Sequence, residues 1–290
     1  MKLYQYINAL FLLLILLTAG YGWTLFNENP QEHLDTSISF VNRSIIEFDG
    51  IKAKNFLVFD FTTGMVIAER DARDIVPLAS LIKIPTVFAA LELHDGQEKI
   101  ILTRNAISQE GDSYLRVGEQ RTIEDLSQFS FITSSNDAAV ALFDHDDAMA
   151  DKMYDILWRS GADTLNTTSP TGLDLYDDTP TATGSAWDMM KIIQYGMQNH
   201  YDYLTQSTQS VLLINSGHST RQLPNTNQLL PAEYDVVFSK TGYTDAAGGN
   251  LVMVIRISDG HTIGLVVLGS TFNGRFTDMQ MLIDSVTHSS

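Results

Sequence analysis

The chain has 290 residues, of which 35 are acidic and 18 are basic, so its formal net charge is −17. This excess of carboxylates argues against nucleic acid binding, which needs clustered lysine and arginine. Apolar residues make up 44% of the sequence, which excludes intrinsic disorder and supplies enough material for a large core. There is no cysteine, so disulfides, zinc–thiolate sites and cysteine nucleophiles are excluded together.

The N-terminal segment predicts export. Residues 7–26 carry no charge, and as a helix they would reach about 30 Å, the thickness of a bilayer core. Lys2 precedes this segment and Glu28 follows it, so the positive-inside rule puts Lys2 in the cytoplasm and the rest of the chain outside. We expect residues 1–26 to be a membrane anchor, or alternatively a cleaved signal, and residues 27–50 to be a polar stalk.

The pattern of strands and helices expected in residues 51–290 predicts a single α/β domain. Strands are indicated near both ends of this region and helices in its middle, so the terminal segments are expected to share a sheet. Neither an internal repeat nor a Pro- or Gly-rich linker divides the region. The expected strands cover residues 56–61 and 65–68, as a hairpin, and 236–238, 251–257 and 262–268; the expected helices cover 80–94, 123–129, 138–143, 149–158, 186–197 and 275–286.

The first candidate catalytic pair is Ser80 with Lys83. They lie three positions apart at the start of a predicted helix, so their side chains share one face. A serine hydroxyl becomes a good nucleophile only when a base removes its proton. A lysine can be that base only when desolvation or a nearby positive charge lowers its pKa. Alone, the pair is a weak signal, and a helix-capping serine beside a solvated lysine explains it better.

A second candidate segment is the run Thr-Ser-Ser-Asn-Asp at residues 133–137, between two predicted helices. Here Ser134 could pass a proton to a leaving group, and the amide of Asn136 could bind a peptide carbonyl. The alternative is a helix cap, which serine and asparagine supply readily.

The third segment is Lys240-Thr241-Gly242, which follows a strand predicted to end at Phe238. A lysine ammonium and a threonine hydroxyl on a strand edge can hold a carboxylate. A glycine there lets a substrate backbone lie close to the same edge. The alternative is an ordinary strand that ends in a turn.

In this order the three segments resemble the active-site triplet of penicillin-binding proteins and serine β-lactamases: Ser-x-x-Lys, Ser-x-Asn and Lys-Thr-Gly. Among these, the chain resembles the serine-type D-alanyl-D-alanine carboxypeptidases, which are low-molecular-mass penicillin-binding proteins. The resemblance covers about residues 55–286 and extends beyond the three motifs. Similar segments lie at 63–66, 77–80, 111–114, 118–126, 169–174, 225–230 and 245–248.

The resemblance implies a β-lactamase/transpeptidase-like α/β fold, with a mainly antiparallel sheet and helices on both faces. It also implies roles for the matched residues in cleaving a D-Ala–D-Ala bond. Ser80 would attack the carbonyl and become acylated, and Lys83 would act as its general base. Ser134 would relay the proton to the departing D-alanine. Asn136 would orient the substrate amide and Lys83.

The same resemblance implies that Lys240 and Thr241 receive the terminal carboxylate, with Gly242 in the same binding edge, and that Lys240 helps to keep Lys83 unprotonated. The backbone N–H groups of Ser80 and Tyr243 would form the oxyanion hole. No cofactor and no metal are implied. The expected partners are peptidoglycan stem peptides and, as covalent inhibitors, β-lactam antibiotics, which places the catalytic domain outside the cytoplasmic membrane.

Two residues depart from the family pattern. Ser135 stands in the middle of the second motif where glycine is usual, and we expect its side chain to narrow the cleft. Tyr243 replaces a frequent histidine, which preserves the backbone donor but alters side-chain contacts with the substrate.

Three alternative functions remain open. A peptidoglycan D,D-endopeptidase or weak transpeptidase would use the same motifs. A class A β-lactamase would need a glutamate to activate water, but alanine occupies that position here, Ala162, and Asp163 lies one place away. A non-catalytic muropeptide binder would tolerate loss of Ser80 or Lys83, yet both are present.

A metalloenzyme is the least favoured reading. The seven histidines are scattered, and none has a partner at metal-binding spacing. His145, among Asp144, Asp146 and Asp147, is interpreted as part of a solvated surface loop; the alternative is an incidental cation site.

Overall fold

The computed structural model describes residues 50–111, 114–215 and 220–287, which carry the fold discussed here. The predicted anchor at residues 1–26, and all but the last residue of the predicted stalk, lie outside these ranges. Among the helices within them, none combines the length and the apolar character that a bilayer crossing requires.

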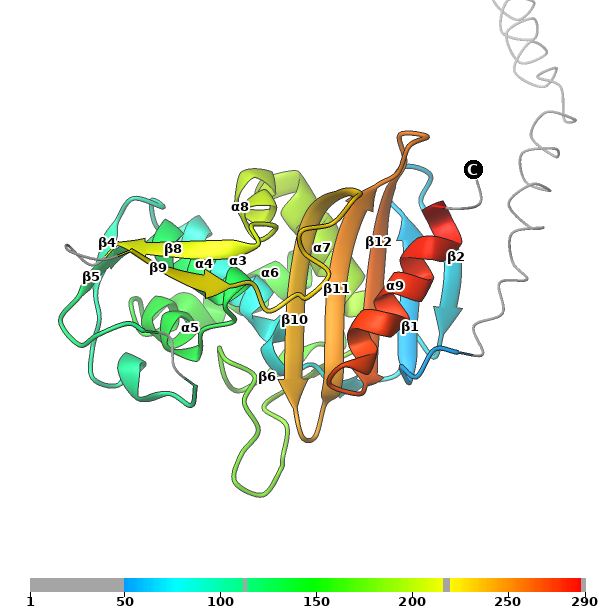
Figure 1. The fold of residues 1–290 in the computed structure, drawn as a ribbon. Coiled ribbons are helices and arrows are strands. Elements are labelled where there is room, and N and C mark those ends of the chain that lie inside the picture. The colour runs from blue at the N-terminus through cyan, green and yellow to red at the C-terminus, as the bar shows by residue number, and fades with distance from the viewer. Residues whose placement is uncertain (1–49, 112–113, 216–219, 288–290) are drawn as a thin grey trace, which may run out of the picture. The chain divides into compact units, whose positions relative to one another are not determined.

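The main sheet has five strands in the order β10-β11-β12-β1-β2, and every neighbouring pair is antiparallel (Figure 1). Strand β1, from the N-terminal side, pairs with β12 from the C-terminal side, which confirms that the terminal segments share one sheet. The strands are β1 (Asn55–Asp60), β2 (Met65–Arg70), β10 (Asp235–Thr244), β11 (Gly248–Arg256) and β12 (Thr262–Ser270).

All six predicted helices are present, and α8 is an additional short one. Helix α7 starts with a capping box in which Ser185 and Asp188 each bind the other's backbone N–H. The helices are α3 (Lys83–Leu93), α4 (Ile123–Ile132), α5 (Asn136–Phe143), α6 (Met149–Ser160), α7 (Ala186–Asn199), α8 (Tyr201–Gln206) and α9 (Gly274–Thr287), with 3-10 turns η2 (Ala79–Ile82) and η3 (Ala106–Ser108).

Three smaller sheets surround the helices, and the sequence analysis predicted none of them. Their strands have only two to five residues, which is too short for a periodic pattern to be read. They pair as β3 (Val76–Pro77), β7 (Ala182–Gly184) and β6 (Asn166–Thr167); β4 (Lys99–Ile101) with β5 (Gln120–Thr122); and β8 (Val211–Asn215) with β9 (Thr220–Pro224).

Alternation along the central strands builds an apolar core on each face of the main sheet, because successive strand side chains point to opposite faces. In β11, Leu251 and Met253 join a cluster with Met279 and other residues of α9. Val252 and Val254 join the larger cluster that includes α7 and the remaining helices. Helices therefore cover both faces of the sheet, as expected. Strand β10 is the edge that lies beside the helical half (Figure 1).

Candidate active site

The three motif segments meet where β10 passes the turn that leads into α3. Lys83, the first residue of α3, is fully buried, and its Nζ lies 2.6 Å from Ser80 Oγ in η2. The same Nζ lies 2.7 Å from Asn136 Oδ1, at the start of α5, and 2.8 Å from the backbone oxygen of Thr171. The first two motifs thus share one hydrogen-bonded amine.

The position of Lys83 gives its amine the properties of a base. Burial lowers its pKa to about 7, because the interior disfavours the charged form. A neutral amine has two hydrogens to donate and one lone pair to accept. The two carbonyl oxygens, of Asn136 and Thr171, can take the hydrogens, which leaves the lone pair for the hydroxyl of Ser80.

A second buried amine belongs to Lys240 on β10. Its Nζ donates to Ser134 Oγ at 2.8 Å and to the backbone oxygen of Thr241 at 2.6 Å. Burial lowers the pKa of Lys240 well below its ordinary value, and the positive charges of Lys83 and Arg275 lower it further. For Lys83, burial is the cause of the lowered pKa.

The backbone around these side chains is strained and closely packed. Ala79 and Ser134 have positive φ angles of 49° and 58°, which typically cost about 1–2 kcal/mol for residues other than glycine. Gly172 also has a positive φ, and a Cβ there would lie 2.1 Å from the Ala79 oxygen. A Cβ on Gly242 would lie 2.9 Å from the oxygen of Leu78. Only glycine lets these segments approach the turn that carries Ser80.

Ser135 does not act as the sequence analysis expected. Its side chain is 6% exposed and caps α5, since its Oγ accepts a hydrogen bond from the N–H of Ala138 at 3.1 Å. The side chain is therefore committed to its own helix, and the expected narrowing of the cleft does not follow. The neighbouring residues instead contact the two buried amines: Ser134 that of Lys240, and Asn136 that of Lys83.

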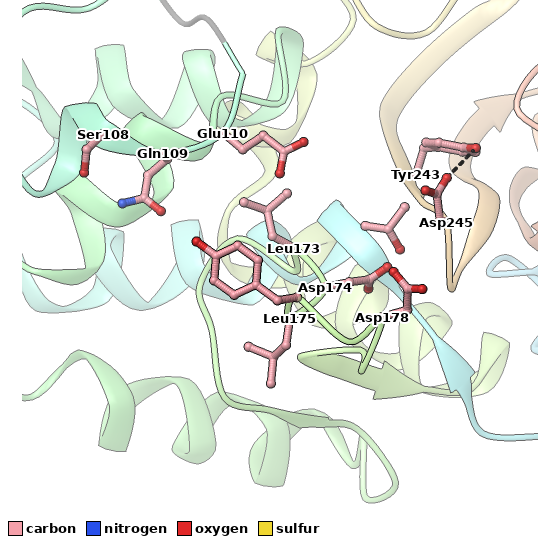
Figure 2. Close-up of a pocket in the computed structure, with 11 residues that line it drawn as sticks. Ser108, Gln109, Glu110, Leu173, Asp174, Leu175, Asp178, Tyr243 and Asp245 are labelled. Carbon is pink, nitrogen blue, oxygen red and sulfur yellow. Dashed lines mark hydrogen bonds between the residues drawn. The ribbon is translucent and has the colours of Figure 1, made fainter.

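An open groove of about 560 Å³ adjoins this network (Figure 2). One wall is formed by the end of η3 and the two residues after it, Gln109 and Glu110. The backbone oxygen of Glu110 accepts a hydrogen bond from Asn136 Nδ2 at 2.7 Å. The opposite wall is the end of β10, where Tyr243 donates a hydrogen bond to Asp245. Four carboxylates line the groove: Glu110, Asp174, Asp178 and Asp245.

Several residues that support the site had no assigned role in the sequence analysis. Thr226 accepts a hydrogen bond from the hydroxyl of Thr241 at 2.7 Å. Arg275, from α9, donates to the backbone oxygen of Gly242 at 2.8 Å, and burial lowers its pKa to about 10. Thr171 contributes only its backbone oxygen, which no side-chain pattern could reveal.

Two of the histidines lie close together, although their spacing in the sequence did not indicate it. His94, just after α3, and His145, two residues after α5, both contact the carboxylate of Glu98. His145 belongs to a cluster of charged side chains rather than to a freely solvated loop. Asp163, the residue nearest to a lactamase-type acid in the sequence, has a largely exposed side chain and lies 4.0 Å from the amine of Lys191.

A family model described as D-alanyl-D-alanine carboxypeptidase matches residues 42–271. The D-alanyl-D-alanine carboxypeptidase DacC of Escherichia coli is 26% identical over 262 residues, which cover 84% of this chain and 64% of that protein. A D-alanyl-D-alanine endopeptidase of Pseudomonas aeruginosa is 27% identical over 234 residues, covering 76% of this chain and 72% of the relative. The chain thus spans slightly less than two thirds of the length of the first of these relatives.

Solved structures share the fold. A D-alanyl-D-alanine carboxypeptidase from Mycobacterium tuberculosis aligns with a TM-score of 0.73 at 24% identity, over 81% of this chain and 91% of that one. Penicillin-binding protein D2 from Listeria monocytogenes, in its ampicillin-bound form, aligns with a TM-score of 0.71 at 25% identity, over 81% and 97% of the two chains. The family model covers most of the sequence and these folds agree with it, so the chain belongs to the D-alanyl-D-alanine carboxypeptidase family of serine peptidases.

Proposed function

We propose that this protein removes the terminal D-alanine from peptidoglycan stem pentapeptides through an acyl-enzyme on Ser80. One observation carries the proposal: a buried amine with a pKa of about 7, on Lys83, lies 2.6 Å from the hydroxyl of Ser80. A base with a pKa near the working pH is suited to activate a serine.

In the acylation step, neutral Lys83 takes the proton of Ser80 while Oγ attacks the carbonyl carbon of the penultimate D-alanine. The oxygen of the tetrahedral intermediate would accept hydrogen bonds from the backbone N–H groups of Ser80 and Tyr243. Donors of this kind typically contribute about 3 kcal/mol each in the transition state. Gly242 supports this placement, because it brings β10 against the turn at Ser80.

Collapse of the intermediate breaks the peptide bond, and the leaving nitrogen needs a proton. We propose that Ser134, which accepts a hydrogen bond from Lys240, passes to this nitrogen the proton that Lys83 took from Ser80, so that Lys83 becomes neutral again. Free D-alanine then departs with the amine it has gained. Water attacks the ester, its proton passes to Lys83, and Ser80 recovers its hydroxyl as the shortened peptide leaves.

The terminal carboxylate would bind Lys240 and Thr241. A carboxylate beside a buried amine raises the pKa of that amine, so substrate binding would restore the charge that burial removes from Lys240. The remainder of the stem peptide would extend into the acidic groove of Figure 2. The carboxylates of this groove favour a peptide whose exposed groups there are neutral or positive.

We further propose that residues 1–26 anchor the protein in the membrane, that 27–50 form a stalk, and that 51–290 form the catalytic domain on the outer side. The uncharged segment between Lys2 and Glu28 supports this arrangement. Cleavage as a signal is the alternative. Covalent inhibition by β-lactams is supported by the similarity to the ampicillin-bound penicillin-binding protein.

The experiment follows the cleavage of three substrates by the full chain. They are a stem pentapeptide, which releases D-alanine, the same peptide with an amidated C-terminus, which releases D-alanine amide, and a cross-linked muropeptide dimer, which gives two monomers. We expect release from the free acid. Lys240→Gln should lower kcat/KM on the free acid about 100-fold, since it removes a buried charge-assisted contact, and should affect the amide far less.

Equal losses on both peptides would contradict the carboxylate-binding role of Lys240. Cleavage of the dimer without release from the pentapeptide would favour an endopeptidase, the alternative supported by the similar endopeptidase of P. aeruginosa. Rapid turnover of penicillin would instead favour a β-lactamase. A chain that cleaves neither the pentapeptide nor the dimer, and that forms no covalent adduct with penicillin, would favour a muropeptide binder.

Substitutions of two adjacent serines should have different effects, one on catalysis and the other on stability. Ser134→Ala removes the proposed proton relay and should lower kcat at least about 100-fold, with little change in the unfolding free energy. Ser135→Ala removes the N-cap of α5 and should lower the unfolding free energy by about 1 kcal/mol while the activity persists. Steady-state kinetics measures kcat for both variants, and urea unfolding measures their stability. A loss of activity in Ser135→Ala with full activity in Ser134→Ala would refute the roles assigned to the two serines.

A further inference from the structure

We propose that His94, Glu98 and His145 form a zinc-binding site at the end of α3 opposite to Lys83. Helix α3 has 11 residues, so the two ends lie about 16 Å apart along its axis. The proposed site and the catalytic amine therefore occupy separate places on one helix. The inference does not depend on the reaction proposed for Ser80.

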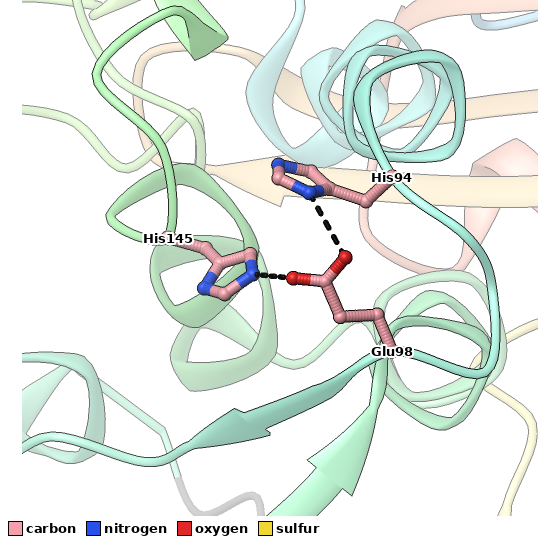
Figure 3. Close-up of side chains that lie close together, drawn as sticks. All are labelled: His94, Glu98 and His145. Atoms are coloured by element: carbon pink, nitrogen blue, oxygen red, sulfur yellow. Dashed lines mark hydrogen bonds and ion pairs between the residues drawn. The ribbon is translucent and has the colours of Figure 1, made fainter.

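The three side chains converge on one point (Figure 3). Nδ1 of His94 lies 3.2 Å from one carboxylate oxygen of Glu98, and Nε2 of His145 lies 2.8 Å from the other. One ligand atom from each residue falls within 4.8 Å of those of the other two. Both imidazoles thus present a ring nitrogen to the same carboxylate.

The three ligand atoms can reach the spacing of a tetrahedral zinc site by small movements of their side chains. Bonds of 2.0–2.1 Å place neighbouring ligand atoms about 3.3 Å apart, so a set that lies within 4.8 Å must contract by at most about 1.5 Å. Two histidines and one glutamate leave the fourth position for water. Imidazole nitrogen suits zinc and its neighbours in the periodic table, whereas calcium and magnesium prefer sites made entirely of oxygen.

A fourth residue supports the assignment independently. The second ring nitrogen of His94, Nε2, is inaccessible to solvent and has no aligned hydrogen bond, but it lies 3.2 Å from a carboxylate oxygen of Asp146. Histidines that bind metal through one nitrogen almost always offer the other to a carboxylate or carbonyl. With Nδ1 on the ion, the Nε2–H of His94 would be directed to Asp146.

The ion would join segments that are distant in the sequence. His94 follows α3, Glu98 precedes β4, and His145 follows α5, whose first residue is Asn136. Because α3 and α5 carry Lys83 and Asn136 at their other ends, the ion would stabilise the helical half without contacting the catalytic groups. The expected effect is therefore on stability and not on the acylation rate.

The test measures binding of zinc chloride to the full chain, purified without a polyhistidine tag and treated with a chelator. Calorimetry should give one ion per chain. At 100 times the dissociation constant, zinc should raise the unfolding temperature by about 5 °C or more. The rate at which benzylpenicillin labels Ser80 should be unchanged.

His145→Gln and the more conservative Glu98→Gln should each weaken zinc binding at least about tenfold. His261→Gln is the matched control, since His261 also contacts a carboxylate, that of Asp60, but lies outside the cluster. Magnesium is the control ion, because a chain with a charge of −17 attracts any cation.

Three outcomes would overturn the proposal. The first is the absence of zinc binding to the chelator-treated chain. The second is wild-type affinity in both cluster variants, and the third is an equal stabilisation by magnesium. A change in penicillin labelling on zinc addition would refute the separation of the two sites.

Discussion

The Ser80→Ala variant is expected to lose all covalent labelling by benzylpenicillin, and its kcat for D-alanine release should fall by about 10⁴-fold or more. The substitution removes the only atom that can form the ester, and nucleophiles of this kind act as a unit with their base, so little partial activity survives. The side chain of Ser80 is partly exposed, so its loss should leave the apolar core intact. Mass spectrometry of the intact protein and of its Ser80 peptide measures the adduct.

Ser160→Ala, at the end of α6, is the matched control for a serine outside the site. It should keep both the adduct and the release of D-alanine. Circular dichroism and the unfolding temperature of Ser80→Ala should match those of the parent chain. An adduct that persists in Ser80→Ala would show that another residue is the nucleophile, and the mechanism proposed above would then be wrong.

The second large effect is expected from Lys83→Met, together with a pH dependence. Only neutral Lys83 can take the proton of Ser80, and its pKa is about 7. The acylation rate of the parent chain should therefore rise about tenfold per pH unit below pH 7 and level off above it. Lys83→Met keeps the apolar volume but removes the base, so acylation should fall by about 10²–10⁴-fold. Stopped-flow labelling with penicillin across pH 5–9 gives both results.

The same pKa has a consequence for stability. An unfolded lysine titrates near pH 10.4, so between pH 7 and about 10.4 the unfolded chain binds a proton that the native state has released. The unfolding free energy should rise with pH over this interval. Lys83→Met should make the unfolding free energy less dependent on pH. Part of the dependence should remain, because the pKa of Lys240 is lowered as well. Lys191→Met, on the surface of α7, is the control and should leave both profiles unchanged.

The large elements could be predicted because their sequences follow a single period. Strand β11 alternates between two cores, so its apolar residues indicated its position directly. Strand β10 was predicted to end at Phe238, but it continues to Thr244. Its continuation begins with three polar residues that are buried, Ser239, Lys240 and Thr241. Polar residues at buried positions therefore interrupted the apolar pattern on which the prediction depended.

The candidate site residues were identified from the order of the motifs, whereas the contacts that surround them in the structure were not predicted. The backbone oxygen of Thr171 carries no residue-specific signal. The clash that requires glycine at position 172 involves the carbonyl of Ala79, far away in the sequence. His94 and His145 meet only because α3 and α5 pack together. Local sequence rules describe neighbours along the chain, and each of these contacts is made across it.

The pairing of β1 with β12 also limits when the protein can become active. Asn55 pairs with Leu268, so a chain that emerges with its N-terminus first presents β1 long before its partner exists. Lys240 emerges nearly as late, because β10 lies near the C-terminal end of the sequence. A partly emerged chain would hold Ser80 without the amine of Lys240 or a closed core. If the chain crosses the membrane unfolded with its N-terminus first, Ser80 gains these partners only after nearly the whole polypeptide has crossed.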